Sequence, residues 1–232
     1  MGKYGQYGAL VGLLLAGPAE AGCRLALALG FDVSRSIDAR DYEIQRQGLM
    51  AALQAADIRR AFLVPPDPVA VTLFEWSGKA DQRVILPWVM VESAADLDAM
   101  VMAIGGHVRG EQRLPTGLGA ALSFGRALLA NAPVCAAMTL DMAGDGQSND
   151  GPSPERIYAT VDFAGVTVNG LAIGDHERDI TRYYETEVIR GPGAFVEPAP
   201  SQKDFPRAIR RKLQRELETK LLGDAGSPPA YR

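Results

Sequence analysis

The sequence predicts an α/β domain whose central sheet is doubly wound, mostly parallel and flanked by helices. Short apolar runs alternate with segments of helical periodicity along most of the 232 residues, the order expected of strand–helix–strand units. Several runs are almost continuously apolar, which is typical of parallel strands buried on both faces. Two further runs resemble a hairpin, and Pro87 in the second of them predicts one antiparallel strand at an edge of the sheet.

The strands are expected where apolar residues run between turn signals. Residues 24–31 end at the polar segment Asp32-Val33-Ser34-Arg35-Ser36, and residues 136–142 end in a cluster of Gly, Asp and Asn. A Gly-containing turn joins residues 69–76 to residues 83–91, which predicts the hairpin. The six expected strands are 24–31, 69–76, 83–91, 136–142, 166–173 and 194–196.

The helices are expected where apolar residues recur at helical spacing behind a capping residue. Ser93, for example, precedes a segment with apolar residues three and four positions apart. The last helix alternates an apolar row with Arg and Lys, and we interpret it as a docked amphipathic helix with a solvated basic face. The expected helices are 38–56, 93–104, 116–130, 155–164, 179–188 and 204–222, followed by a disordered tail at 223–232.

Length and charge limit the classes of protein. The length and a 47% content of hydrophobic residues fit one domain with a sizeable core, expected over residues 22–222. A net charge of −4 argues against a protein that coats nucleic acid. Beyond the N-terminus, no apolar segment is long enough for a transmembrane helix, so we expect no membrane span.

Residues 1–21 have the pattern of a signal peptide. Lys3 provides a weak positive region, residues 9–16 an apolar core, and Ala19-Glu20-Ala21 a small-residue cleavage site. We therefore expect a periplasmic or secreted protein. Two alternatives remain open: a buried N-terminal helix, and a lipoprotein anchored through Cys23, for which Glu20 is a poor match.

The two cysteines predict a disulfide. Cys23 and Cys135 each come directly before an apolar run, so both would lie at the N-terminal edge of neighbouring parallel strands. Exported proteins retain disulfides because their compartment is oxidising. We expect a Cys23–Cys135 bond rather than two free thiols.

Oxygen-bearing side chains follow the strands that are expected to be neighbours. They are Asp32, Ser34 and Ser36 after the first strand, Thr116 at the start of a helix, and Asp145 after the strand at 136–142. Ligands of α/β sheets bind beyond the C-terminal ends of the strands. Carboxylates and hydroxyls without imidazole or thiolate favour Mg²⁺ or Mn²⁺. A capping turn at Asp32–Ser36 and an N-cap role for Thr116 are the simpler alternatives.

These residues resemble the metal-ion-dependent adhesion site (MIDAS) of von Willebrand factor A (VWA) domains. Asp32-x-Ser34-x-Ser36, Thr116-Gly117 and Asp145-Gly146 occur in the family's order. Further segments, including Glu75-Trp76-Ser77-Gly78 and Tyr183-Tyr184, are similar to a bacterial exported subgroup of the DUF1194 type, over about residues 23–222. The resemblance implies a VWA-like fold and a divalent cation near Ser34, Ser36 and Thr116, with Asp32 and Asp145 binding it directly or through water.

Arg35 departs from the family, which often has glycine at this position. Its side chain could shield the site or recruit an acidic partner. The resemblance implies a binding module whose metal accepts an Asp or Glu carboxylate from an unknown protein partner, and we expect no enzyme. The alternative is a Mg²⁺-dependent hydrolase or phosphatase, which metal-dependent turnover of a phosphoester panel would favour. A dinucleotide-binding domain is rejected because no Gly-x-Gly-x-x-Gly follows the first strand.

The remaining polar residues are given structural interpretations. We expect Asp141, Asp150 and Asp175 to be surface or turn residues near the same edge of the sheet. His107 and His176 are expected in exposed loops, because neither has a recognisable Ser or Cys partner.

Overall fold

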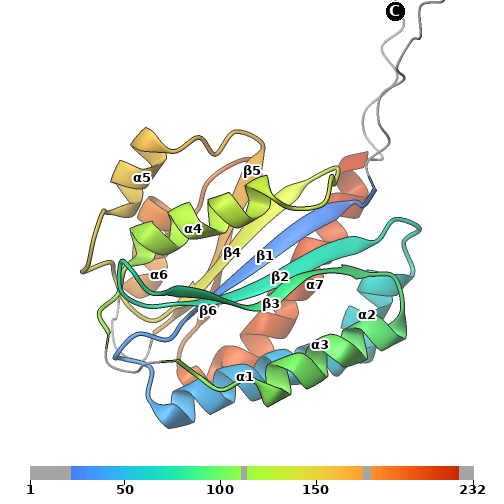
Figure 1. Cartoon of the computed structure of the whole chain (residues 1–232), viewed down its shortest axis with the longest axis horizontal. Coiled ribbons are helices and arrows are strands. Elements are labelled where there is room, and N and C mark those ends of the chain that lie inside the picture. The colour runs from blue at the N-terminus through green and yellow to red at the C-terminus, as the bar shows by residue number, and fades with distance from the viewer. Residues whose placement is uncertain (1–21, 111–113, 175–178, 225–232) are drawn as a thin grey trace, which may run out of the picture.

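The computed structural model describes residues 22–110, 114–174 and 179–224, so the predicted signal peptide and residues 225–232 of the predicted tail lie outside it. A six-stranded sheet forms the centre, in the order β3-β2-β1-β4-β5-β6 (Figure 1). Only β3 is antiparallel to its neighbour, which confirms the predicted fold class. The strands are β1 (Leu25–Asp32), β2 (Val69–Trp76), β3 (Gln82–Val91), β4 (Met138–Gly144), β5 (Val166–Ile173) and β6 (Val196–Ala199).

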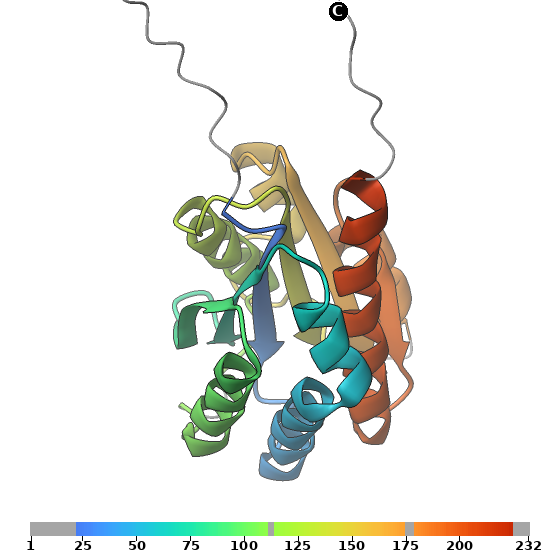
Figure 2. The same ribbon diagram turned by 90° about the vertical axis from the view of Figure 1, so that its right-hand side faces the viewer.

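Helices cover both faces of the sheet (Figures 1 and 2). One face packs against α1 (Ala39–Gln54), α2 (Ala56–Leu63), α3 (Ala94–Gly106) and α7 (Phe205–Asp224). The other packs against α4 (Leu118–Ala130), α5 (Pro154–Thr160), α6 (Ile180–Tyr183) and the π-helical turn η1 (Tyr184–Val188). A short 3₁₀ turn, η2 (Gln202–Asp204), precedes α7, whose last residues reach beyond the boundary predicted at 222.

The central strand β1 is apolar throughout because both of its faces are covered. Leu25, Leu27 and Leu29 point into the layer of α1 and α7, whereas Ala26 and Ala28 point toward α4. All five side chains are 2% exposed or less. Burial of this kind stabilises the fold by roughly 1.5–3 kcal/mol for each large side chain. The apolar run is therefore most stable as a central strand.

Several boundaries differ from the prediction: α5 ends at Thr160 rather than at 164, and β6 spans Val196–Ala199 rather than 194–196. Two further helices differ for local reasons. The first helix ends at Gln54, because Ala55 adopts an extended backbone (φ −66°, ψ 135°), and α2 then begins at Ala56. We expected one helix over 38–56 and did not predict α2. The expected helix at 179–188 is instead the short α6 followed by η1.

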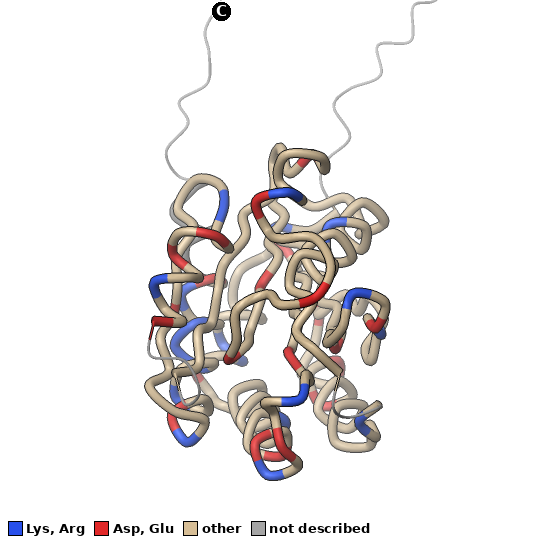
Figure 3. Tube along the Cα trace, turned by 90° about the vertical axis from the view of Figure 1, so that its left-hand side faces the viewer, with Lys and Arg blue, Asp and Glu red and all other residues tan. Residues whose placement is uncertain are grey.

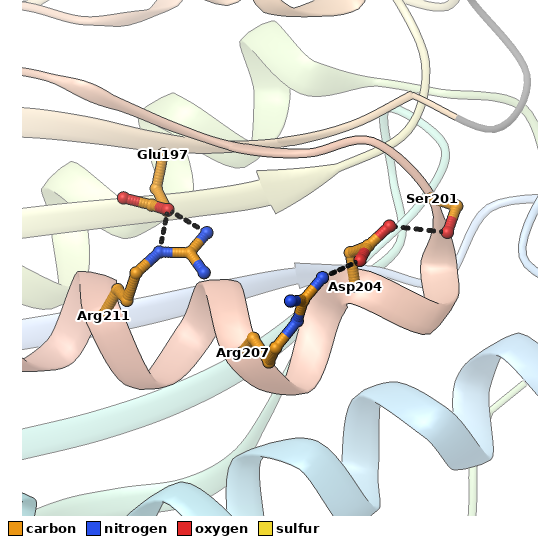
Figure 4. A network of polar contacts seen from close by, with 5 residues as sticks. All are labelled: Glu197, Ser201, Asp204, Arg207 and Arg211. Atoms are coloured by element: carbon orange, nitrogen blue, oxygen red, sulfur yellow. Dashed lines mark hydrogen bonds and ion pairs between the residues drawn. The ribbon is translucent and has the colours of Figure 1, made fainter.

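The last helix docks on β6 and the sheet. Its apolar row, Phe205, Ile209, Leu213 and Leu217, is fully buried. On its outer side Arg211 Nε donates to Glu197 Oε1 of β6 at 2.8 Å, while Arg207 pairs with Asp204, whose carboxylate also accepts from Ser201 Oγ at 2.9 Å (Figure 4). These exposed pairs add little stability, so the apolar row accounts for most of the docking.

A disulfide joins Cys23 and Cys135 at the N-terminal edge of the sheet, with Cα atoms 4.5 Å apart and a sequence separation of 112. The two residues also form a parallel bridge beside β1 and β4. The Cys23 sulfur in this bond is not available for acylation. Within the described ranges, no helix is long and apolar enough to cross a membrane.

Candidate metal centre

Three loops meet at the C-terminal edge of the sheet. Asp32 ends β1 and Asp145 follows β4, and these two strands are parallel neighbours. Thr116 lies in the loop between α3 and α4. Figure 3 looks toward this side of the molecule, where acidic and basic positions are interspersed. The topology therefore brings the predicted site residues to one place from three distant parts of the sequence.

Hydrogen bonds connect all five predicted residues. Thr116 Oγ1 donates to Ser34 Oγ at 3.3 Å, and Ser34 Oγ lies 3.3 Å from Ser36 Oγ. Ser36 Oγ donates to Asp145 Oδ1 at 2.6 Å, and the Ser34 backbone N–H donates to Asp32 Oδ1 at 2.7 Å. The result is a continuous cluster of carboxylate and hydroxyl oxygens, which we call the oxygen cluster.

Two carboxylates, those of Asp32 and Asp145, share this cluster. Asp32 and Asp145 are both 0% exposed. Burial raises the pKa of Asp32 to about 7, and the nearby Asp145 adds to the increase while hydrogen bonds from Ser34 oppose it. Asp32 Oδ2 has no hydrogen-bond partner among the described residues. Placing a divalent cation here would compensate both carboxylates, so the residues present fit such an ion.

The side chains of the oxygen cluster offer only carboxylate and hydroxyl oxygens as ligands. In the part of the chain that the structure describes, no group of three or more His, Cys, Asp or Glu residues could hold a metal ion. A cation at the oxygen cluster would therefore depend on hydroxyls as well as the two carboxylates. That composition favours Mg²⁺ or Mn²⁺, which prefer oxygen ligands and retain water.

Thr116 does not cap the helix that follows it. Gly117 is the N-cap of α4, and no side chain caps this helix. Thr116 is instead held from behind, since its N–H donates to Asn149 Oδ1 at 2.9 Å and its carbonyl accepts from Asn149 N–H at 2.8 Å. The hydroxyl is left to face Ser34.

Arg109 supports the loop that contains Asp32, Ser34 and Ser36, and the sequence analysis did not identify it. Its Nη2 donates to the carbonyl oxygens of Val33 at 2.9 Å and Ile37 at 2.7 Å, and its guanidinium lies 5.1 Å from the centre of the Tyr42 ring. An isolated Arg in a loop has no sequence signature of this role, because its acceptors are backbone atoms more than 70 residues away.

A cavity of about 180 Å³ opens beside the oxygen cluster. Arg35 is exposed and is one of the residues that line this cavity. The lining residues are Arg35, Ser36, Leu114, Pro115, Thr116, Asp145, Gly146 and Asn149. Oxygens of the cluster and a positive side chain thus line one opening.

One carboxylate that was predicted to lie at the surface is in fact buried. Asp141, expected in a surface position, is 2% exposed and lies 2.8 Å from Lys212 Nζ, which also lies 2.7 Å from Glu216 Oε1. Lys212 and Glu216 are on α7, so the helix interpreted as having a solvated basic face contains a fully buried lysine. We call Asp141, Lys212 and Glu216 the buried triad. A fourth residue, Asn169 of β5, contacts the buried triad by donating to Glu216 Oε1 at 2.7 Å.

His107 was expected to be exposed but is paired. Its side chain is 12% exposed, and Nε2 lies 3.1 Å from Glu75 Oε2. The other carboxylate oxygen, Glu75 Oε1, accepts from the Tyr42 hydroxyl at 2.6 Å. The polar contacts arise because α1, β2 and the loop after α3 converge, which the sequence does not indicate. Asp150 is a loop residue beside Lys79, whereas Asp175 and His176 lie outside the described residues.

The buried triad gives a pH prediction for the metal-free protein. Burial raises the pKa of Asp141 to about 7 from an ordinary value of 3.8, Lys212 opposes this and Glu216 adds to it. The folded state therefore retains a proton that the unfolded chain has lost, and stability from this group falls as pH rises from about 4 to 7. We expect the chelator-treated protein to resist urea better at pH 5 than at pH 8. Asp141→Asn should reduce that difference, and an unchanged difference in this variant would contradict the assignment.

Comparisons with known proteins agree with this architecture. A family model described as "Protein of unknown function (DUF1194)" matches residues 22–221. A comparison with curated proteins returns no match. Among solved structures, a von Willebrand factor type A protein from Catenulispora acidiphila is 13% identical with a TM-score of 0.61, over 84% of this chain and 43% of that one.

Two other similar structures are a mussel byssus protein and a bacterial minor pilin. Proximal thread matrix protein 1 from the mussel byssus, described with a zinc-occupied MIDAS motif, is 14% identical with a TM-score of 0.61, over 84% of this chain and 46% of that one. The PilB minor pilin from Streptococcus sanguinis is 12% identical with a TM-score of 0.57, over 91% and 65%. This chain spans less than half the length of the first structures it matches. Such identities show a shared fold.

Proposed function

The chain belongs to the DUF1194 family and has a VWA-like fold, and from this premise we propose that it is an exported, metal-dependent binding module. Asp32, Ser34, Ser36, Thr116 and Asp145 would hold one Mg²⁺ or Mn²⁺ ion. When bound, the ion supplies a Lewis-acidic position for a carboxylate from a protein partner. The disulfide favours an oxidising compartment outside the cytoplasm.

The oxygen cluster is the observation that carries the proposal. Two fully buried carboxylates and three hydroxyls come together from separate loops. Hydrogen bonds from hydroxyls do not offset the repulsion between two buried anions, whereas a divalent cation does. The mussel protein's MIDAS is described with zinc, so metal titrations of this chain should include Zn²⁺ beside Mg²⁺ and Mn²⁺.

Arg35 supports an acidic ligand rather than a basic or neutral one. Arg35 is exposed and lines the cavity that Ser36, Thr116 and Asp145 also line. A carboxylate that approaches the ion would therefore meet a second positive group. Arg35 adds attraction at the rim of the site without replacing any ligand of the ion.

The ligand class is testable with peptides that carry one Asp or Glu among neutral residues, immobilised beside matched Asn and Gln peptides. In Mn²⁺ buffer, we expect the protein to retain the acidic peptides and to release them in chelator. Arg35→Glu should weaken retention roughly tenfold, equivalent to about 1.4 kcal/mol, because the rim charge becomes repulsive. Its Mn²⁺ affinity, measured by calorimetry, should be at least that of the wild type.

Arg60→Glu is the matched control. Arg60 is exposed on α2, near the opposite edge of the sheet where Arg24 donates to the carbonyl of Ala61. This variant has the same charge change and should retain the peptides like the wild type. Equal retention of acidic and amide peptides, or retention that survives the chelator, would reject an acidic ligand at the ion.

A further inference from the structure

Tyr184 lies directly behind the oxygen cluster, in a slot formed by two glycines. Its side chain is 0% exposed. A Cβ at Gly170 of β5 would lie 2.6 Å from Tyr184 Cδ1, so the ring crosses the strand where this residue has no side chain. A Cβ at Gly144 of β4 would lie 2.5 Å from the Tyr184 hydroxyl oxygen and 3.0 Å from Asp32 Oδ2. The slot thus directs the hydroxyl toward Asp32.

Two buried polar atoms face the same small space. Neither the Tyr184 hydroxyl nor Asp32 Oδ2 has a hydrogen-bond partner within the described residues. Buried polar atoms in folded proteins are almost always paired, so an unpaired donor beside an unpaired acceptor calls for an explanation. Phenylalanine would fill the slot equally well without this cost, which makes packing alone an insufficient reason for tyrosine.

The surroundings keep the phenol in its donor form. Burial, followed by the charges of Asp32 and Asp145, holds the pKa of Tyr184 well above its ordinary value of 10.0. A protonated phenol can donate to a carboxylate but cannot coordinate a cation as an anion. Tyr184 also begins η1, and π-helical turns of this kind occur often at functional sites.

The adjacent residue, Tyr183, contacts the loop that follows Asp145. The Ser148 backbone N–H donates to the Tyr183 hydroxyl at 3.2 Å, three residues after Asp145. The two adjacent tyrosines, whose ring centres lie 6.2 Å apart, therefore lie next to the site, Tyr183 at the loop that follows Asp145 and Tyr184 behind Gly144. Their position at the junction of α6 and η1 connects this turn to the site.

We propose that Tyr184 is a positioning residue for the cation, and that its hydroxyl hydrogen-bonds to Asp32 Oδ2, directly or through one water, when the ion is bound. This deepens the proposed function and rests on it. Hydrogen bonds to metal-ligating carboxylates orient them, and loss of such a bond typically weakens metal binding about 10- to 100-fold. The Tyr184–Asp32 hydrogen bond would form when the ion binds, so it would strengthen metal binding more than it stabilises the metal-free fold.

The test compares Tyr184→Phe with Tyr158→Phe. Tyr158 is also a largely buried tyrosine, but its hydroxyl donates to the backbone carbonyl of Val188 and it lies on α5. We expect Tyr184→Phe to bind Mn²⁺ at least tenfold more weakly, with a chelator-treated melting temperature equal to or above that of the wild type. Tyr158→Phe should show the reverse: wild-type Mn²⁺ affinity and a lower melting temperature.

A spectroscopic signal separates positioning from packing. Mn²⁺ should produce a tyrosine ultraviolet difference spectrum in the wild type and in Tyr158→Phe, but a diminished one in Tyr184→Phe. Unchanged Mn²⁺ affinity in Tyr184→Phe, with binding by the wild type, overturns the inference and leaves the proposed function intact. A wild-type protein that binds no divalent cation rejects the proposed function and the inference together.

Discussion

Replacing Asp32 and Asp145 together by asparagine is expected to abolish Mn²⁺ binding and to raise the melting temperature of the chelator-treated protein. Both carboxylates are fully buried, and burial together with Asp145 raises the pKa of Asp32 to about 7. An ionised Asp32 beside Asp145 therefore destabilises the metal-free fold, and asparagine side chains remove this cost while preserving shape. For a domain of this size, each kcal/mol gained should raise the melting temperature by about 2–4 °C.

Calorimetric titration and thermal unfolding, both after chelation, measure the two effects. Asp98→Asn is the control. Asp98, on α3, is exposed and pairs with Arg59 of α2, so loss of this carboxylate should change neither Mn²⁺ binding nor the melting temperature appreciably. A double variant that still gives the wild-type isotherm would exclude the oxygen cluster as the metal site. A double variant with a much lower metal-free melting temperature would show that the carboxylates stabilise the fold through their hydrogen bonds.

Replacing Lys212 by methionine is expected to lower the free energy of unfolding by about 3–5 kcal/mol at pH 8, because it leaves two buried carboxylates without a counter-charge. Lys212 is 0% exposed, and its ammonium contacts Asp141 and Glu216 at 2.8 and 2.7 Å. Proximity of these carboxylates raises its pKa although burial alone would lower it. Urea unfolding of the chelator-treated protein is the measurement.

Removing the two remaining charges of the buried triad should restore much of the free energy of unfolding that Lys212→Met loses. The triple change Lys212→Met, Asp141→Asn and Glu216→Gln removes all three charges, and buried ion pairs replaced by neutral groups are often no less stable. Lowering the pH to 5 should also rescue Lys212→Met in part, because Asp141, whose pKa is raised to about 7 by burial, becomes protonated. If Lys212→Met unfolds within about 1 kcal/mol of the wild type at pH 8, the triad does not depend on its ammonium.

Much of the fold follows from local patterns. The strands β2 and β5 begin and end where the apolar runs predicted, and Pro87 lies on the antiparallel edge strand as its missing N–H requires. The predicted disulfide is present between residues that directly precede two neighbouring strands. In contrast, α2 was not predicted, because only the extended backbone of Ala55 separates it from α1.

The candidate site was predicted as a set of residues, and the structure brings all five together. This was possible because parallel strands end at one edge, so polar residues after neighbouring strands must meet. The supporting residues were not predictable in the same way. Arg109 binds distant carbonyls, and Tyr184 packs where Gly144 and Gly170 have no side chains. Lys212 followed by Glu216 has the sequence of an ordinary exposed i, i+4 pair.

The sequence alone determined the order of strands and helices, the edge at which the oxygen-bearing side chains gather, and the chemistry of those side chains. Only the tertiary structure decided which polar groups lie in the interior and what faces them. The reason is that hydrophobic periodicity and strand-end motifs are local properties. The electrostatics of a side chain, by contrast, depends on burial and on partners far away in the sequence, as with Asp141 and Lys212.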